Sequence, residues 1–394
     1  MKEISNDKMV LKTPFHSRVA EACEINSWGN WMGYTTPDVY VDAELEYFAV
    51  RSTTGVLDLS PMHKYRVTGP DAEPYLNRLL TRNVSKIGVG RVAYTVWCDD
   101  AGQVLDDGTL FHLAENDYRL CAYARATDWL AWSAVGFDVE VVDETAEIAA
   151  LAVQGPTSCS SLRAMGLDGL ENLKPFGLTH FDFEGESLMV SRTGFTGDLG
   201  YELWIAAEKA EALWDSLFAA GKPFMIKPFG THALEIARIE CGFIQAGVDF
   251  MPAEEVIRPG RSRSPFELGL GWLVDLTKPN FNGRQALLRE KREGSRYQFV
   301  ILDVDGNKPA HNSFVMKGNK TVGTVTSAAW CPTAKSNVAF AQVESGYGGI
   351  GEELTVEIYY ERELQWTKVL APCKVLEKSV FDPARRRETP AVAF

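Results

Sequence analysis

The sequence predicts an α+β protein in which two duplicated α+β lobes are followed by a small β-barrel. Val67-Thr-Gly-Pro70 recurs as Val153-Gln-Gly-Pro156, each after an apolar run and each before a stretch with helical spacing. From residue 297 onward, short alternating runs separated by turns replace the mixed pattern, which indicates a β-barrel or sandwich. No stretch of about eighteen uncharged apolar residues occurs, so no membrane span is predicted.

The N-terminal region, residues 1–60, combines an aromatic-rich loop with a helix predicted over 41–52. Aromatic ring faces attract cations, so rings gathered here could enclose a cationic substrate. The alternative is that they only pack the loop. The aromatic residues concerned are Trp28, Trp31, Tyr34 and Tyr40.

Each copy of the repeat contains two predicted helices and an acidic turn that enters a strand. The helices cover 73–80 and 125–134 in the first copy, and 158–165 and 208–219 in the second. The turns carry Asp107 and Glu202, respectively. Two such lobes related by a pseudo-twofold axis would direct both carboxylates toward a shared centre.

A glycine-rich turn leads into the strand that carries Glu202. Gly194, Gly197 and Gly200 lie within the segment Ser191-Arg-Thr-Gly-Phe-Thr-Gly-Asp-Leu-Gly-Tyr-Glu-Leu203. Glycines at this density allow a backbone to approach a flat ligand closely. A tight hairpin with a surface acid is the alternative.

The C-terminal region should begin after a proline-containing loop over 252–265. Gly346-Tyr-Gly348-Gly-Ile-Gly351 has the spacing of a dinucleotide fingerprint, but a strand pattern follows it, so it is interpreted as a hairpin loop. The tail after Phe381 is predicted to be a surface extension. Barrel strands are predicted over 298–304, 321–327, 337–343, 353–360 and 368–376.

Composition excludes several classes of function. The net charge of −13 argues against nucleic acid as the main partner. The seven cysteines and six histidines are scattered without metal-ligand spacing, so no metal site is expected. Residues 1–7 lack an apolar signal core, which predicts a cytoplasmic protein.

Eight segments, in order, resemble the glycine-cleavage T-protein family of tetrahydrofolate-dependent one-carbon transferases. This resemblance implies a cloverleaf fold. It has a folate-binding domain over 1–64 and 151–295, an inserted ferredoxin-like lobe over 65–150, and a barrel over 296–394. The segments are 49–60, Leu105-Asp-Asp107, Val153-Gln-Gly-Pro156, 191–197, Gly200-Tyr-Glu202, Arg238-Ile-Glu240, 265–272 and Gly323-Thr-Val-Thr-Ser327.

The resemblance also implies roles for individual residues. Asp107 corresponds to the catalytic or substrate-orienting carboxylate, and Glu202 to the glutamate that binds the pterin of tetrahydrofolate. Phe195 stands where T-proteins commonly have tyrosine. The other positions that align with folate contacts, each of which could instead be core packing, are Tyr94, Met62 and Trp272.

Departures from the family pattern concern the substrate. Leu234-Glu235 replaces the usual Arg-Asp pair, His63 is displaced by one position, and Tyr123 replaces a small polar residue. These changes argue against a lipoyl carrier protein as partner. The segments 13–18 and 173–185 are more similar to the dimethylsulfoniopropionate demethylase branch.

We therefore expect an enzyme that moves a methyl group from a small S-, N- or O-methylated donor to N5 of tetrahydrofolate. An onium donor could be recruited by Asp107 and by the rings of Trp31 and Tyr34. An ether donor would need a general acid such as His63 or Tyr123. Aminomethyltransferase-type methylene transfer and a non-catalytic folate-binding regulator are the alternatives.

Overall fold

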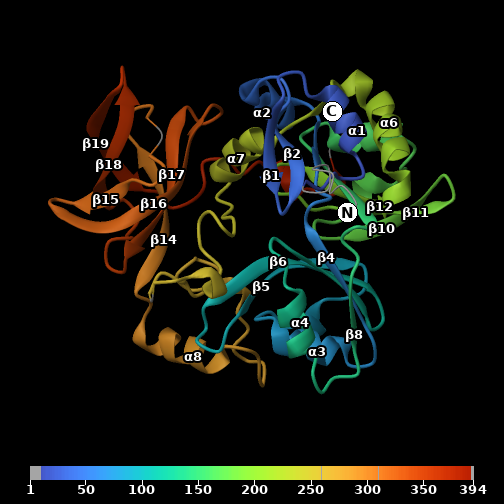
Figure 1. Ribbon diagram of the computed structural model, residues 1–394, viewed down its shortest axis with the longest axis horizontal. Helices are drawn as coiled ribbons and strands as arrows, with labels where there is room; N and C mark the ends of the chain where they lie inside the picture. Colours follow the sequence, from blue (N-terminus) through green and yellow to red (C-terminus); the bar gives the residue numbers. More distant parts are fainter. Residues whose placement is uncertain (1–9, 259, 309, 392–394) are drawn as a thin grey trace, which may run out of the picture.

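The computed structural model describes residues 10–258, 260–308 and 310–391, which form three lobes (Figure 1). The predicted α+β class with a C-terminal barrel is confirmed. The segment 1–7, on which the prediction of a cytoplasmic protein depends, lies outside the described residues. Within the described ranges, no helix combines the length and apolar character needed to cross a membrane.

The first lobe is built on a six-stranded sheet in the order β10-β11-β12-β9-β3-β13. Its strands are antiparallel except for β13, which pairs in parallel with β3. β3 and β9 are hydrogen-bonded neighbours although the second lobe separates them in sequence. The strands are β3 Gly55–Asp58, β9 Ile148–Gln154, β10 Leu178–Phe183, β11 Glu186–Ser191, β12 Gly200–Ala206 and β13 Lys227–Pro228.

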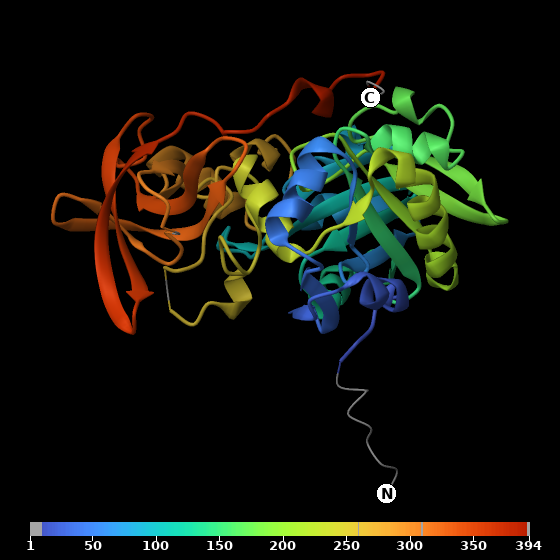
Figure 2. The same ribbon diagram turned by 90° about the horizontal axis from the view of Figure 1, so that it is seen from above.

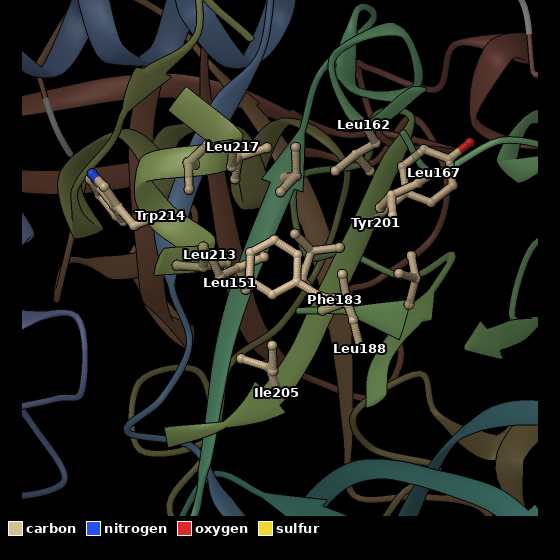
Figure 3. Close-up of a cluster of buried hydrophobic side chains, with 14 of the residues drawn as sticks. Leu151, Leu162, Leu167, Phe183, Leu188, Tyr201, Ile205, Leu213, Trp214 and Leu217 are labelled. Atoms are coloured by element: carbon tan, nitrogen blue, oxygen red, sulfur yellow. The ribbon is translucent and has the colours of Figure 1, made fainter. Parts of the chain in front are cut away.

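Helices α5 (Ser158–Ala164) and α6 (Ala210–Gly221) cover one face of this sheet, with α1 (His16–Ala22) against α6. Successive strand residues point to opposite faces, so Tyr201 and Ile205 of β12 join this core. Figure 3 labels them among the buried side chains of this cluster, together with Leu162 of α5 and Leu213 and Leu217 of α6. Burying one such leucine stabilises the fold by about 1.5–3 kcal/mol.

The second lobe contains a five-stranded sheet in the order β5-β6-β7-β4-β8. Helices α3 (Ala72–Leu79) and α4 (Thr127–Ser133) pack on one face around the fully buried Tyr75 and Leu110. The strands are β4 His63–Thr68, β5 Arg91–Cys98, β6 Val104–Ala114, β7 Asp117–Ala122 and β8 Glu140–Asp143.

The two sheets share a strand order, which supports the predicted duplication. β4 to β8 correspond to β9 to β13, with β3 inserted between β9 and β13. The pairing of Asp107 with Glu202 as equivalent residues is wrong, however. Glu202 lies on β12, which corresponds to β7, whereas Asp107 lies on β6. The first copy has two strands between its acidic turn and its second helix, and the second copy has only one.

The free faces of the two sheets pack against each other. Phe111 of β6 meets Trp204 of β12 edge to face, with ring centroids 5.1 Å apart. Around this contact lies a core, here called the inter-sheet core, that also includes Cys121, Leu57 and Met189. Helices α2 (Ala43–Ser52) and α7 (Thr231–Glu240) extend it, and the hairpin of β1 (Ser27–Trp31) and β2 (Tyr34–Val39) lies beside α7.

The third lobe is a closed six-stranded barrel in the order β14-β17-β16-β15-β18-β19. Sequence analysis predicted five of its strands and missed the short β15. The glycine-rich segment 346–351 is a loop between β17 and β18, but the hairpin prediction is wrong, because β17 pairs with β14 and β16 whereas β18 pairs with β15 and β19. The strands are β14 Tyr297–Val304, β15 Phe314–Lys317, β16 Lys320–Cys331, β17 Ser336–Glu344, β18 Glu353–Arg362 and β19 Gln365–Val375; α8 (Arg284–Glu293) precedes them.

The C-terminal tail runs over the surface as predicted, with every residue from 381 to 390 at least partly exposed, but it is anchored at its far end. It crosses from the barrel back to the first lobe, as Figure 2 shows. There Arg385 makes two hydrogen bonds of 2.6 and 2.7 Å to Asp198, whose side chain is fully buried. Arg192 in turn donates to the backbone oxygens of Arg385, Arg386 and Glu388. The tail is therefore fixed against the predicted glycine-rich turn.

Candidate active site

Glu202 lies on β12 and faces the second lobe. Side chains alternate along a strand, so the Glu202 side chain lies on the same face of the sheet as Trp204, and the Tyr201 side chain lies on the other face. Thr193 Oγ1 donates a 2.6 Å hydrogen bond to Glu202 Oε2, and Ser191 Oγ lies 3.5 Å from the same oxygen. Burial raises the pKa of Glu202 to about 7, although both hydroxyls act to lower it.

The glycine-rich turn before β12 is shaped around Gln154. A Cβ atom on Gly194 or Gly200 would lie only 2.0 or 2.2 Å from Gln154 Oε1. Gln154 Nε2 donates to the backbone oxygens of Thr193 and Tyr201 at 3.3 and 3.2 Å. Sequence analysis noted the motif that contains Gln154 but missed this role, because the proximity arises only when β9 pairs with β12.

Asp107 lies on β6 and is held by two hydrogen bonds from the second lobe. Tyr94 Oη donates to Asp107 Oδ2 at 2.6 Å, and the Asp107 amide donates to Asp106 Oδ1 at 2.8 Å. Burial raises the pKa of Asp107 to about 6; the Tyr94 hydroxyl opposes this shift and Asp249 adds to it. Burial and the adjacent Asp107 also raise the pKa of Asp106.

Both predicted acids face the space between the two sheets. Asp107 and Phe111 lie on the same face of β6, and Glu202 and Trp204 lie on the same face of β12. Phe111 packs on Trp204, so these two faces meet. Glu202 also raises the pKa of the Cys121 thiol, and Cys121 pairs with Thr109, two residues from Asp107. The carboxylates therefore lie on the same side of the Phe111–Trp204 contact.

The aromatic and apolar residues predicted to contact folate lie in different surroundings. Phe195, at the glycine-rich turn, lies 5.5 Å from the Phe243 ring. The rings of Tyr94 and Trp272 are 6.1 Å apart, and Trp272 is 66% exposed, so the structure does not make it a core residue. Met62 packs against the inter-sheet core.

His63 is a wrong candidate for the acid of this site. It pairs with Ala122 and stacks on Tyr65, so it points to the helix-covered face of the second sheet, away from Asp107. Tyr34 lies within electrostatic range of Asp143 and Asp58. Among the described contacts, Tyr34 has none with either central carboxylate.

The N-terminal aromatic residues do not form one cage. Tyr40 is buried in the core beneath α5 and α6, and Trp28 packs against that core beside His16. Trp31 alone packs against the inter-sheet core, and its indole N–H is buried without a hydrogen-bond partner among the described residues. Tyr123 lies at Asp107's end of the sheet, hydrogen-bonded to Gln245 and close to Asp106.

A buried ionic network beside Asp107 was missed by sequence analysis. Asp249 accepts hydrogen bonds from Arg238 of α7 and from Thr326 and Ser327 of β16. Arg238 is completely buried and also binds Glu235 through two nitrogens. The motifs that contain Arg238 and Ser327 were recognised, but nothing in the sequence marks Asp249 as their common partner.

The described residues contain no group of three or more His, Cys, Asp or Glu side chains arranged to hold a metal ion. The titratable groups gathered around the inter-sheet space are instead carboxylates, tyrosines and arginines. This arrangement suits a ligand with N–H donors at Glu202 and a cation at Asp107.

Comparisons with known proteins cover nearly the whole chain. Residues 17–278 match the GCVT N-terminal domain, and residues 297–375 match the glycine cleavage T-protein C-terminal barrel domain. The chain is 33% identical over 335 residues to an aminomethyltransferase of Caldanaerobacter subterraneus subsp. tengcongensis, covering 84% of this chain and 87% of that protein.

Two further comparisons bear on fold and length. The chain is 33% identical over 396 residues to a trimethylamine-oxide aldolase of Ruegeria pomeroyi; the match covers 96% of this chain but only 48% of that protein. The crystal structure of the glycine cleavage system aminomethyltransferase T of Bartonella henselae superposes with a TM-score of 0.83, at 24% identity, over 96% of this chain and 99% of that one. At this identity, the similarity to the Bartonella henselae structure shows that the two proteins share a fold.

Proposed function

Because the chain belongs to the glycine cleavage T-protein family of tetrahydrofolate-dependent one-carbon transferases, we propose that it transfers a methyl group from a small methylated donor to N5 of tetrahydrofolate. The observation that carries the proposal is the placement of Asp107 and Glu202 on facing sheets, on one side of the Phe111–Trp204 contact. One carboxylate can then hold the pterin while the other meets the donor.

The residues present fit tetrahydrofolate. Glu202 offers a carboxylate that can accept two parallel hydrogen bonds from the 2-amino and ring N–H edge of a pterin. Phe195, at the glycine-rich turn, provides a ring for stacking. When bound, tetrahydrofolate supplies the N5 amine that takes up the one-carbon unit.

The charges around Asp107 favour a cationic donor. Asp107 and Glu254 act electrostatically to raise the pKa of Asp106, and Asp249 acts to raise the pKa of Asp107. Arg238 forms ion pairs with Asp249 and Glu235, and not with Asp106 or Asp107. Buried carboxylates that repel one another are stabilised by a positive ligand, so a sulfonium or quaternary ammonium group suits this end of the space.

An onium donor also simplifies the chemistry required of the protein. With tetrahydrofolate bound, a bond from the methyl carbon to N5 would form as the bond from that carbon to sulfur or nitrogen breaks. The electron pair would stay on the leaving group, a neutral sulfide or amine would depart without a general acid, and the proton of N5 would be lost to solvent. Holding donor and acceptor at near-attack distance can supply roughly 7–11 kcal/mol. For an ether donor, Tyr123 remains the candidate acid, since His63 lies on the other face of its sheet.

The proposed partner is a small molecule. The departure at Leu234-Glu235 supports this choice over a lipoyl carrier protein, because Glu235 is engaged with Arg238. The net charge of −13 supports the absence of nucleic acid among the partners. A sulfonium donor is part of this proposal because the carboxylates around Asp107 favour a cation.

The second candidate function is methylene transfer of the aminomethyltransferase type. It is favoured by the names of several relatives, including aminomethyltransferases of Caldanaerobacter subterraneus and Lysinibacillus sphaericus, the latter 32% identical over 332 residues. The product distinguishes the two candidates, because methyl transfer yields 5-methyl-tetrahydrofolate and methylene transfer yields 5,10-methylene-tetrahydrofolate.

The test is a turnover screen of sulfonium, betaine and methoxy-aromatic donors with tetrahydrofolate, with the folate product identified by mass spectrometry. We expect 5-methyl-tetrahydrofolate from an onium donor, and its loss in Asp107→Asn but not in the control Asp117→Asn, which alters an ion pair with Arg66 on the same sheet. Formation of 5,10-methylene-tetrahydrofolate would favour the second candidate. Tight folate binding without a product from any donor would indicate a non-catalytic binding protein.

A further inference from the structure

A chain of hydrogen bonds leads from the inter-sheet core to Glu202. Trp204 Nε1 donates to Ser191 Oγ at 3.3 Å, and Ser191 Oγ lies 2.7 Å from Thr193 Oγ1. Thr193 Oγ1 donates to Glu202 Oε2 at 2.6 Å. Trp204, Ser191 and Thr193 are at most 9% exposed, so water cannot readily replace these bonds.

The donor at the start of this chain fixes its direction. An indole N–H can only donate, so Ser191 Oγ must accept from Trp204. Ser191 then has its own proton for Thr193 Oγ1 at 2.7 Å or for Glu202 Oε2 at 3.5 Å, and Thr193 directs its proton to Glu202 Oε2. A proton on Glu202 Oε2 would make that oxygen a donor, so Thr193 would have to turn its own proton away and the short hydrogen bond to Oε2 would be lost. The arrangement therefore favours the ionised form of Glu202.

We infer that Ser191, Thr193 and Trp204 are positioning residues that keep Glu202 an oriented carboxylate for the N–H edge of a pterin. The inference rests on the proposed function. Both hydroxyls reach Oε2, Thr193 at 2.6 Å and Ser191 more weakly at 3.5 Å, and neither contacts Oε1, so the carboxylate can still accept further hydrogen bonds along its other edge.

The second lobe secures the start of the chain. Phe111 contacts the Trp204 ring edge to face, and the Arg119 guanidinium lies 6.0 Å from its centroid. The titratable group that faces Glu202 from this lobe is Cys121, whose thiol Lys64 and Arg119 also influence. The first lobe presents Ala152 and Ser191, both uncharged, as the cross-strand neighbours of Glu202.

The test is a ¹³C NMR titration of the Glu202 carboxyl in the unliganded, full-length protein, with the signal assigned by its loss in Glu202→Gln. The wild-type midpoint should lie near pH 7. Thr193→Val removes the hydroxyl at similar volume and should raise the midpoint by roughly one pH unit, since a hydrogen bond to a charged group is worth about that much. Thr193→Ser should restore the wild-type midpoint, and Trp204→Phe should raise it by less.

The matched control is Thr54→Val, which removes a buried hydroxyl that bonds to Thr157 and Ser161 in the same lobe. It should leave the midpoint unchanged. An unchanged midpoint in both Thr193→Val and Trp204→Phe would overturn the inference. Tetrahydrofolate affinity of the same variants, measured by calorimetry at pH 7, should fall about tenfold in Thr193→Val. If the midpoint shifts in Thr193→Val but Glu202→Gln binds tetrahydrofolate as tightly as the wild type, the positioning role stands and the proposed pterin contact is refuted.

Discussion

At the scale of single residues, Asp107 and Glu202 share one property, a pKa that burial has raised toward neutrality. The values are about 6 for Asp107 and about 7 for Glu202, and each is opposed by hydroxyl donors, from Tyr94 or from Thr193. Both groups can therefore respond to a ligand near pH 7. A bound cation or N–H donor favours the ionised form and so lowers both pKa values.

Replacing Asp107 with asparagine should separate substrate turnover from folate binding. The variant keeps the size of the side chain but loses its charge, so we expect turnover to fall by a factor on the order of 10²–10³ while folate affinity stays within a few-fold. In the wild type, kcat/KM should rise as the pH increases through about 6, because the ionised carboxylate is the active form. Steady-state kinetics between pH 5 and 8 check both expectations, and unchanged turnover would remove Asp107 from the mechanism.

Glu202 should make the unliganded protein less stable as the pH rises. Its folded pKa, about 7, lies above the ordinary value of 4.5, so the folded state binds the proton more tightly and loses this advantage between those two values. At pH 8 the free energy of unfolding of Glu202→Gln should therefore exceed that of the wild type by about 2–3 kcal/mol, which moves its denaturation midpoint to a higher denaturant concentration. At pH 4.5 the two proteins should differ little. An equal difference at both pH values would contradict the raised pKa.

At the scale of elements, the alternation along strands and the helical spacing predicted five helices, α2 to α6, and five of the six barrel strands. The helix over 158–165 appears as Ser158–Ala164, and the strand over 337–343 as Ser336–Glu344. The sequence could not predict which other elements pack against each face of a strand. His63 looked suited to the site by its position in the chain, but pairing with Ala122 turns it toward the helices. The role of Gln154 likewise depends on a strand pairing.

The glycine-rich turn should not tolerate a side chain at Gly200. The obstacle is steric and not the backbone φ. The added Cβ would lie 2.2 Å from Gln154 Oε1 and would displace the side-chain amide that donates to the backbone oxygens of Thr193 and Tyr201. Gly200→Ala should therefore destabilise the protein by about 1–3 kcal/mol, the range for overpacking a filled site. Gly349→Ala is the control, since no atom lies within 4 Å of its Cβ position. Chemical denaturation compares the two, and equal effects would contradict the role of Gln154.

At the scale of the whole molecule, contacts between distant segments hold the three lobes around the carboxylates. Asp249 joins α7 to β16 through Arg238 and Ser327, and the tail returns from the barrel to Asp198. The sequence predicted the three lobes from their local patterns. It could not predict these contacts, because a buried ion pair leaves no periodic signal and Arg385 lies in a segment with the composition of a solvated tail.

The tail should contribute to stability through Arg385. Arg385→Ala leaves the buried Asp198 carboxylate without its ion pair, which should cost about 2–4 kcal/mol, since removal of one partner of a buried pair is strongly destabilising. The neighbouring Arg387 pairs with the partly exposed Asp382, so Arg387→Ala should cost no more than about 1 kcal/mol. Thermal unfolding of both variants provides the comparison, and equal effects would show that the tail is not anchored by Asp198.

The central claim, that two carboxylates on facing sheets flank one bound folate, is tested most directly by a crystal structure with 5-methyl-tetrahydrofolate. The account predicts that the Glu202 oxygens lie about 2.7–3.2 Å from the pterin N–H groups and that the methyl group faces Asp107. A pterin bound away from Glu202, or a methyl group directed away from Asp107, would contradict it.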